Sequence, residues 1–469
     1  MKVPWETNVA DMNDYNSALP KMRQYFESGA TLPYSFRKKQ LTRLLETVLA
    51  YDEQINAALY TDLKKSKEET WATETGLVIQ EIKGALQHLK KWMRPQTAPT
   101  GLVTFPSSAK MYKDPLGIVL IIAPWNYPLQ LMLIPLVGAI AAGNCAVLKP
   151  SELAPATEKI LFKIIEKSFE DQYVTVVGGN GAEVIPAMMQ QFKFNHVFYT
   201  GGHLVGKEIY KMAAEDMVPV TLELGGKSPC IVYDDAAIHV AARRIVLGKF
   251  VNAGQTCVAP DYVLVQEKVR NQLLDALKAV IQEFYSNDPA SSIDYGKIIN
   301  ERRFLKLVSY LKGESIFFGG THDQAQLYIA PTIITDVSLD DGLMREEIFG
   351  PLLPVLSFAT TQDAMQIVRR NENPLALYLF TKNKKIQEEW MHKIPFGGGC
   401  INNTVWHFAN EHLPFGGIGN SGWGAYHGKH SFTLFTHLKP VLTSSTLIDP
   451  ALKYPPFKGK MKWFKKLIG

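Results

Sequence analysis

Short apolar runs alternate with helix-length amphipathic segments along most of the chain. In the first half, the runs read IVLIIA from residue 118, CAVLK from 145, YVTVVGG from 173, HVFYT from 196 and VTLEL from 220. Strands that are apolar throughout and are separated by helices are typical of a parallel sheet covered on both faces. The pattern therefore predicts a doubly wound α/β domain.

Helical patterns precede this alternation, and a second alternation follows it. Residues 36–63 and 73–93 carry apolar positions at helical spacing, which predicts a packed helical start. After Gly226 the apolar runs read CIVYD, YVLVQ, LPVLSF, ALYLF and GGGCIN, with helical patterns between them. We therefore expect a second α/β domain, with the boundary near Glu223.

The distribution of charge adds information about partners only at the C-terminus. The 469-residue chain is 46% hydrophobic and has a net charge of +5, but residues 450–469 hold six lysines and no acid. The rest of the chain is close to neutral, so it provides no basic face for nucleic acid. Only the tail favours an anionic partner.

The cysteines and histidines indicate neither a disulfide framework nor a metal site. The four cysteines are widely spaced and form no C-x-x-C pair. His407 and His412 flank Glu411 at spacings that match no zinc-protease motif. The start of the chain, MKVPWETNVADMNDY, has acids and a proline where a signal peptide needs a basic start and an apolar stretch. We therefore expect a cytoplasmic protein without a metal.

Three polar residues stand where α/β enzymes place their chemistry. Cys257 in FVNAGQTCVAP follows a helical pattern, although a lone cysteine is more often buried and inert. Asn126 in PWNYP follows an apolar strand, where its amide N–H can stabilise an oxyanion. Glu223 in TLELGG ends another strand, and a carboxylate in apolar surroundings has a raised pKa and can act as a base. A paired structural acid is the alternative for Glu223.

A glycine-rich turn follows the apolar run that ends at Thr200. Gly201, Gly202 and Gly206 open a helical pattern, and such a turn can present backbone N–H groups to a phosphate. His203 occupies the middle glycine position of the dinucleotide fingerprint. A plain strand-to-helix turn therefore remains the alternative.

Five motifs occur together at the separations found in one family: APWNYP, KPSE, TLELGGKSP, FVNAGQTCVAPDY and EEIFGP. By these motifs the chain resembles the aldehyde dehydrogenase superfamily from about Phe36 to Pro440. The segment LPFGGIGNSGWGAYHGKHSF is similar to the class 3, fatty-aldehyde branch.

The resemblance implies a Rossmann-like cofactor domain, an α/β catalytic domain, a small β bridging element for oligomerisation, and a homodimer. The implied bounds are 1–95 with 113–222 for the dinucleotide-binding domain, 223–407 for the catalytic domain, 96–112 with 408–447 for the bridging element, and 448–469 for a basic tail.

The resemblance also implies roles for individual residues. Cys257 is the expected nucleophile, Glu223 the general base, and Asn126 the oxyanion donor together with the Cys257 backbone N–H. The residues expected to bind the cofactor on the same basis are Trp125, Lys149, Glu152, Thr200, Gly201, Gly206, Leu224, Glu347 and Phe349.

The expected cofactor is NAD, with NADP tolerated. The resemblance places Lys149 and Glu152 at the adenosine ribose, and Glu347 with Phe349 at the nicotinamide ribose and ring. Most relatives have Ser where Gly202 stands, so one hydroxyl contact to the pyrophosphate is absent.

The expected activity is oxidation of an aldehyde to a carboxylic acid through a thiohemiacetal and a thioester on Cys257. The branch implies medium-chain or long-chain aliphatic aldehydes, or aromatic ones. The alternatives are a CoA-acylating aldehyde dehydrogenase, a cofactor-independent thiol esterase and a non-enzymatic structural protein.

The C-terminal residues predict one further element. From Pro456 to Gly469, apolar side chains recur at helical spacing and lysines fall on the other side, which predicts a short amphipathic helix. Such a helix can contact an anionic membrane surface. A solvated tail, or one docked on the body, is the alternative.

Overall fold

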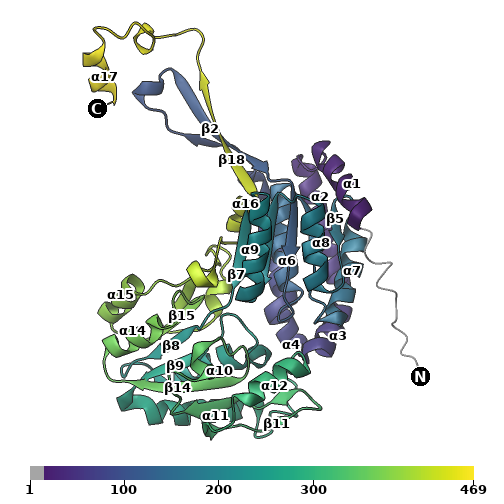
Figure 1. Cartoon of the computed structure of the whole chain (residues 1–469), viewed down its shortest axis with the longest axis vertical. Helices are drawn as coiled ribbons and strands as arrows, with labels where there is room; N and C mark the ends of the chain where they lie inside the picture. The colour runs from purple at the N-terminus through teal and green to yellow at the C-terminus, as the bar shows by residue number, and fades with distance from the viewer. Residues whose placement is uncertain (1–14, 469) are drawn as a thin grey trace.

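The computed structural model of the chain describes residues 15–468 (Figure 1). Residues 1–14 and 469 lie outside the described part, and with them the start of the predicted dinucleotide-binding domain and the last residue of the predicted tail helix. Two α/β bodies lie one below the other, and an arm of three strands projects from the upper body (Figure 1).

The upper body is built on a six-stranded sheet with the order β17-β7-β6-β3-β4-β5. The five apolar runs of the first half form its parallel strands, and β17 pairs antiparallel with β7. The strand order reverses between β3 and β6, and ligands bind at the carboxyl ends of strands at such a switch point. The strands are β3 (Ile118–Ile122), β4 (Cys145–Lys149), β5 (Val174–Val176), β6 (His196–Gly201), β7 (Val220–Leu224) and β17 (Gly422–Trp423).

Helices cover both faces of this sheet. The helix α6 (Gln130–Ala142) is buried along all 13 residues, because it is apolar all round and lies between the sheet and the helices α2 and α5. The predicted helical segment 36–63 divides at Tyr51 into two helices, and Lys64 ends the second with a left-handed φ of 55°. The other helices here are α1 (Tyr15–Glu27), α2 (Tyr34–Ala50), α3 (Asp52–Leu63), α4 (Lys67–Thr70), the π-helix η2 (Trp71–Thr75), α5 (Gly76–Trp92), α7 (Pro155–Ser168), α8 (Gly181–Gln191) and α9 (His203–Glu215).

The lower body contains a seven-stranded sheet with the order β10-β13-β14-β9-β8-β15-β16. All its strands run parallel except β10, so the second alternation of apolar runs forms a second α/β body as predicted. The strands are β8 (Pro229–Val232), β9 (Tyr262–Gln266), β10 (Ser315–Phe318), β13 (Thr332–Thr335), β14 (Leu352–Phe358), β15 (Ala376–Phe380) and β16 (Gly398–Ile401). The helices are α10 (Ile238–Phe250), α11 (Arg270–Tyr285), α12 (Glu301–Ser309), α13 (Gly342–Arg345), α14 (Thr361–Arg369) and α15 (Lys384–Lys393). The helix α16 (Lys429–Leu434) packs on α5 and α6 of the upper body. A two-stranded ribbon of β11 (His322–Asp323) and β12 (Tyr328–Ile329) completes this body.

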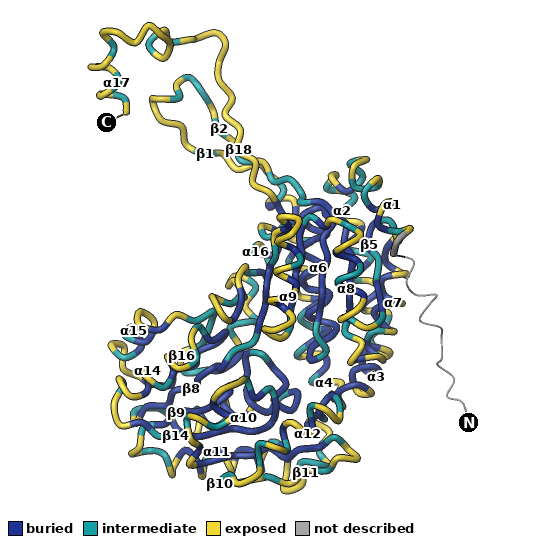
Figure 2. Tube along the Cα trace, viewed as in Figure 1, coloured by how far each residue is buried: buried dark blue, intermediate teal, exposed yellow. Residues whose placement is uncertain are grey.

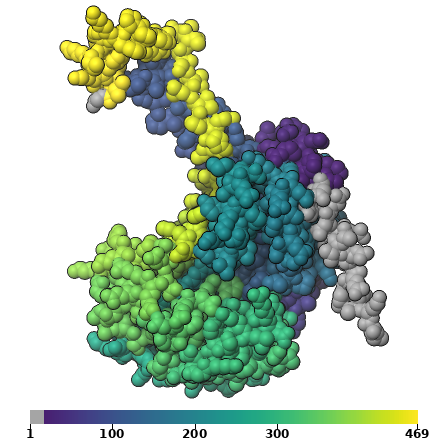
Figure 3. All heavy atoms as spheres, viewed as in Figure 1, coloured from purple at the N-terminus to yellow at the C-terminus, as the bar shows by residue number. Residues whose placement is uncertain are grey.

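The arm is an antiparallel sheet of β1 (Gln96–Ala98), β2 (Ser107–Pro115) and β18 (Thr436–Ser444). It is mostly exposed and stands away from both bodies, in contrast to their buried sheets (Figures 2 and 3).

The predicted tail helix begins later than expected. The helix α17 spans only Met461–Ile468, whereas the sequence pattern predicted a start at Pro456. Gly459 has a φ of +86°, and this left-handed conformation interrupts a right-handed helix. Among the described residues, no helix has the length and apolar character needed to cross a membrane.

Candidate active site

The turn that carries Cys257 reverses the chain between α10 and β9. Asn252, Ala253 and Gly254 have φ values of 52°, 50° and 75°, a left-handed conformation that is unfavourable for the first two residues. A Cβ on Gly254 would lie 2.3 Å from the carbonyl oxygen of Gly350. The motif FVNAG therefore packs tightly on the EEIFGP segment and brings Cys257 and Glu347 into the same site.

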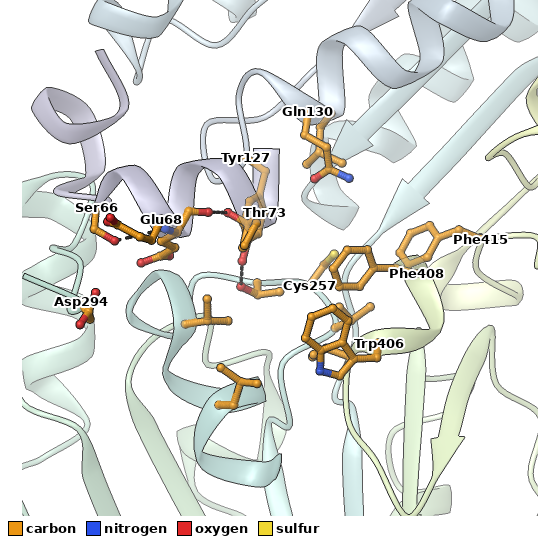
Figure 4. Close-up of a pocket in the computed structure, with 18 of the residues that line it drawn as sticks. Ser66, Glu68, Thr73, Tyr127, Gln130, Cys257, Asp294, Trp406, Phe408 and Phe415 are labelled. Atoms are coloured by element: carbon orange, nitrogen blue, oxygen red, sulfur yellow. Dashed lines mark hydrogen bonds between the residues drawn. The ribbon is translucent and has the colours of Figure 1, made fainter. Parts of the chain in front are cut away.

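Cys257 lies where two cavities meet. One cavity, of about 430 Å³, is largely apolar, and the other, of about 590 Å³, is lined by polar residues and by the ends of β6 and β7. Figure 4 shows the aromatic side chains of Trp406 and Phe408 beside Cys257, and Ser66 and Asp294 toward the other end of the apolar cavity. The thiol can therefore meet ligands that arrive from two sides.

The electrostatics of the site keep this thiol protonated. Burial, together with the smaller effect of the carboxyl groups of Glu347 and Glu223, raises the pKa of Cys257 to about 12. A thiolate is the nucleophilic form, so the sulfur needs a nearby positive charge or a base to react at neutral pH. Cys145 and Cys230 are fully buried in strands, and burial raises the pKa of each thiol as well.

Glu223 is a buried acid with an unusual lack of hydrogen bonds within the described part of the chain. It lies on β7 opposite Gly422 of β17, and it is only 2% exposed. Neither carboxyl oxygen has a hydrogen-bond partner among the described residues, so the alternative of a paired structural acid finds no partner here. Burial raises the pKa of Glu223 well above its ordinary value. The group therefore has a high proton affinity, as a base in a dry site requires.

Asn126 lies in the turn that follows β3 and is 2% exposed. Its side-chain Nδ2 donates to the carbonyl oxygen of Gln255 at 3.1 Å, two residues before Cys257. A carboxamide has two N–H donors, so the second remains available to a ligand. Asn126, Glu223 and Cys257 all line the polar cleft, and the structure thus brings the three candidate catalytic residues together.

The polar cleft lies at the switch point between β3 and β6. The residues that were expected to bind the cofactor and that line it are Trp125, Thr200, Gly201, Leu224, Glu347 and Phe349. The buried hydroxyl of Thr200 has no hydrogen-bond partner among the described residues, and Gly202 precedes the first turn of α9 with open space around its Cα. A free donor beside a helix N-terminus fits an anionic phosphate.

Gly206, on the first turn of α9, packs the helix onto the sheet instead of lining the cleft. A Cβ at this position would lie 2.7 Å from Cδ2 of Leu224. His203, at the fingerprint's middle glycine position, is exposed, and its Nδ1 lies 3.3 Å from the carbonyl oxygen of Asn420.

Lys149 and Glu152 lie at the end of β4. The buried Lys149 Nζ donates to the carbonyl oxygen of Pro150 and lies 3.4 Å from Oε2 of Glu152. The Glu152 side chain is 40% exposed and accepts from the backbone N–H of Gly181 at 3.3 Å. A hydroxyl-bearing ribose fits this pair of a donor and an acceptor.

The EEIFGP segment closes the other side of the cleft. The Phe349 ring meets the Trp125 ring edge to face, with 5.3 Å between centroids. Burial raises the pKa of Glu347 to about 8, and the nearby carboxylate of Asp261 adds to this shift. The phosphate, ribose and aromatic-ring contacts together fit a dinucleotide.

Sequence reasoning missed several residues of the site. Arg303 donates to the carbonyl oxygens of Ile348 and Phe349, and the buried Lys227–Asp261 ion pair supports the same segment through the Ile348 N–H. Lys227 and Asp261 stand inside the motifs TLELGGKSP and FVNAGQTCVAPDY, so the motifs contained a signal for them. Arg303 lies in no motif, and only the fold brings it to the cleft.

A cleft that fits a dinucleotide, at the switch point of a parallel sheet and joined to an apolar cavity at a half-buried cysteine, is typical of an α/β oxidoreductase. Residues 2–441 match the sequence model of the aldehyde dehydrogenase family, and the chain belongs to this family. Its members oxidise aldehydes to carboxylic acids with NAD or NADP.

Two curated relatives are similar over almost their whole length. The 4,4'-diaponeurosporen-aldehyde dehydrogenase of Staphylococcus aureus (strain NCTC 8325 / PS 47) is 44% identical over 460 residues, which cover 98% of this chain and 99% of the relative. Aldehyde dehydrogenase family 3 member A2 of Mus musculus is 42% identical over 448 residues, which cover 95% and 92%. These relatives confirm the class 3 branch that the motifs predicted.

Solved structures share the fold. A substrate-bound state of Staphylococcus aureus AldH has a TM-score of 0.95 at 43% identity, and covers 98% of this chain and 100% of that one. An indole-3-acetaldehyde dehydrogenase in complex with NAD+ has a TM-score of 0.83 at 27% identity, with 93% and 89% covered. A glyceraldehyde-3-phosphate dehydrogenase of Methanocaldococcus jannaschii in complex with NADP has a TM-score of 0.82 at 25% identity, with 92% and 94% covered.

Proposed function

We propose that Cys257, Glu223 and Asn126 carry out the aldehyde oxidation, and that the apolar cavity selects a medium-chain or long-chain aliphatic, or an aromatic, aldehyde. The observation that carries this proposal is the position of the Cys257 thiol at the junction of the apolar cavity and the polar cleft. An aldehyde with an apolar tail fits one cavity, and a dinucleotide fits the other.

The order of the steps follows from these positions. The Cys257 thiol gives its proton to the carboxylate of Glu223, which passes it to solvent, and the sulfur adds to the aldehyde carbon. The amide N–H of Asn126 and the Cys257 backbone N–H hold the oxygen that becomes negative. When bound, the nicotinamide supplies the hydride acceptor that no side chain provides. The thiohemiacetal is thereby oxidised to a thioester on Cys257. Glu223 then takes a proton from the attacking water, and the acid and the thiol are released.

The substrate class is supported by the cavity lining. Apolar residues from several separate elements line the cavity, and they include Leu131, Leu247, Val251, Phe284, Trp406, Phe408 and Phe415. Each methylene buried there contributes about 0.8 kcal/mol, which corresponds to about four-fold in kcat/KM. A series of aldehydes of increasing length tests this, and a flat response would contradict the apolar substrate.

The cofactor preference is proposed as NAD over NADP. Glu152 supports it, because its partly exposed carboxylate lies beside Lys149 and disfavours the extra phosphate of NADP. Glu152→Gln should raise the kcat/KM with NADP relative to NAD by about five-fold, a size typical of one screened charge contact. Glu208→Gln, in an exposed ion pair with Lys211, is the control and should leave the ratio unchanged.

We also propose that the chain divides into the domains implied by its motifs and that two copies form a homodimer. The three-stranded arm stands away from the bodies with exposed apolar side chains, and this supports a role in pairing two copies. Light scattering coupled to size-exclusion chromatography tests the dimer, and a monomer would contradict it.

The tail is proposed to contact anionic membrane surfaces from the cytoplasm. All four cysteines are free, as a reducing compartment requires. Met461, Trp463 and Ile468 are exposed on α17, and lysines lie among them. Co-sedimentation with anionic vesicles should decrease for a chain that ends at Pro455. Equal sedimentation of both chains would exclude the tail as the contact.

A further inference from the structure

Lys65 and Glu74 form a buried ion pair that is not part of the candidate catalytic or cofactor residues. Lys65 Nζ lies 2.7 Å from Oε1 of Glu74, and neither side chain has any exposed surface. Glu74 belongs to the π-helix η2, and π-helical turns frequently occur at functional sites. Removing two charges from water is unfavourable unless the pair is well bonded, so its further partners are informative.

Both members of the pair bind the turn that carries Asn126. Lys65 Nζ donates to the backbone carbonyl oxygen of Asn126 at 3.1 Å and lies 3.9 Å from the centroid of the Tyr127 ring. Glu74 Oε2 accepts the backbone N–H groups of Leu129 and Gln130, both at 3.0 Å. The ion pair therefore holds both ends of the turn from 126 to 130.

The same turn is bonded to the nucleophile segment. Asn252 Nδ2 donates to the Asn126 carbonyl oxygen at 2.8 Å, so this oxygen accepts from both sides. The hydroxyl groups of Tyr127 and Thr256 lie 2.6 Å apart, and Thr256 directly precedes Cys257. The distance between the Asn126 amide and the Cys257 sulfur thus depends on a network that Lys65 and Glu74 complete.

We propose that Lys65 and Glu74 are positioning residues that fix the Asn126 amide for the oxyanion formed at Cys257. This inference rests on the proposed donor role of Asn126. Among the residues that line the two cavities, neither Lys65 nor Glu74 occurs, so they act through the turn and not on the substrate. A small displacement of an oxyanion donor weakens its bond to the transition state and leaves substrate binding largely intact.

The test uses Lys65→Met and Glu74→Gln in the full chain. Each variant should lower kcat by about 10-fold to 100-fold, with the KM for aldehyde and the Kd for the cofactor within about three-fold. Alkylation of Cys257 by iodoacetamide forms no oxyanion, so its rate should stay within about two-fold. Arg243→Met, in the exposed ion pair with Glu283, is the control and should keep the kcat of the wild type.

A double-mutant cycle with Asn126→Ala separates positioning from a general structural effect. When the amide is already absent, Lys65→Met should lower kcat by no more than about two-fold. If Lys65→Met lowers kcat as much in the Asn126→Ala background as in the wild type, the positioning role is wrong and the donor role of Asn126 still stands. An unchanged kcat for Asn126→Ala itself would overturn the donor role, and with it the positioning.

A double variant that removes both charges tests the proposal if one of the single variants does not fold. Lys65→Met with Glu74→Met removes both charges together, which avoids an unpaired buried charge. It should show the same fall in kcat and the same non-additivity with Asn126→Ala. A folded double variant with the kcat of the wild type would also overturn the proposal.

Discussion

The two cavities that meet at Cys257 are constructed differently. The polar cleft takes its candidate catalytic residues and most of its candidate cofactor residues from short motifs, such as Trp125 with Asn126 and Glu223 with Leu224, whereas Arg303 comes from outside them. The apolar cavity takes single side chains from distant elements, such as Leu131 of α6, Phe284 of α11 and Trp406. The proposed catalytic residues are therefore encoded in local motifs, whereas the proposed substrate cavity depends on the packing of separate elements.

Cys257 lines both cavities, and its loss should have the largest effect. Cys257→Ser should abolish turnover and leave folding and cofactor binding intact, because a serine without a strong base is a poor nucleophile at neutral pH. The assay is the rate of reduced cofactor formed with an aldehyde. Cys145→Ala, Cys230→Ala and Cys400→Ala are controls that should remain active. Substantial activity of Cys257→Ser would remove the thiol from the mechanism.

Glu223→Gln should slow the reaction at the polar cleft and leave the choice of aldehyde unchanged. The amide keeps the shape of the carboxyl group but cannot accept a proton, and general-base catalysis contributes about 10²-fold to 10⁴-fold. Steady-state turnover should fall by that order, with an unchanged preference among aldehydes. Stopped-flow measurement should show a burst of reduced cofactor when deacylation limits the rate. An unaltered turnover would exclude the role.

Trp406→Ala should weaken only the contact between the apolar cavity and the tail of a long aldehyde. The loss of part of the indole contact with a long substrate is expected to cost about 1.4 kcal/mol, which is a ten-fold decrease in kcat/KM. Acetaldehyde is the matched control, because it is too short to use the contact. The same decrease for both aldehydes would show that Trp406 supports the site in some way other than by binding the substrate tail.

Glu347→Gln should have the smallest effect, and this effect should depend on pH. The pKa of Glu347 is raised to about 8, so its carboxyl group is mostly neutral at pH 7 and mostly charged at pH 9.5. Its negative charge raises the pKa of the Cys257 thiol, and removing that charge lowers this pKa. Alkylation of Cys257 should therefore become about five-fold faster at pH 9.5 and change little at pH 7.

The control for this measurement is the neighbouring residue. Glu346→Gln removes an exposed carboxylate that is paired with Lys306, and it should leave the alkylation profile unchanged. A slower alkylation of Glu347→Gln at pH 9.5 would contradict the electrostatic coupling.

Much of the fold could be predicted because it depends on local patterns. Each apolar run of the first half forms a parallel strand, since a strand buried on both faces must be apolar throughout. The predicted ends of the helices were less accurate, because they depend on the backbone conformation of single residues. Periodicity does not contain the left-handed φ at Gly459, so the tail helix starts five residues later than predicted, and the segment 36–63 divides at Tyr51.

The sequence by itself determined the strands, the motifs at their ends and the types of chemistry that those motifs bring, because each depends on neighbouring residues. Only the tertiary structure decided which groups are left without partners and which are paired at a distance. The carboxyl group of Glu223 is buried without a hydrogen-bond partner in residues 15–468, while Lys65 and Glu74 bind the turn after β3 across more than 50 positions of sequence. Burial and hydrogen bonding between distant segments arise from packing, and packing sets the pKa values and the positions of the groups that react.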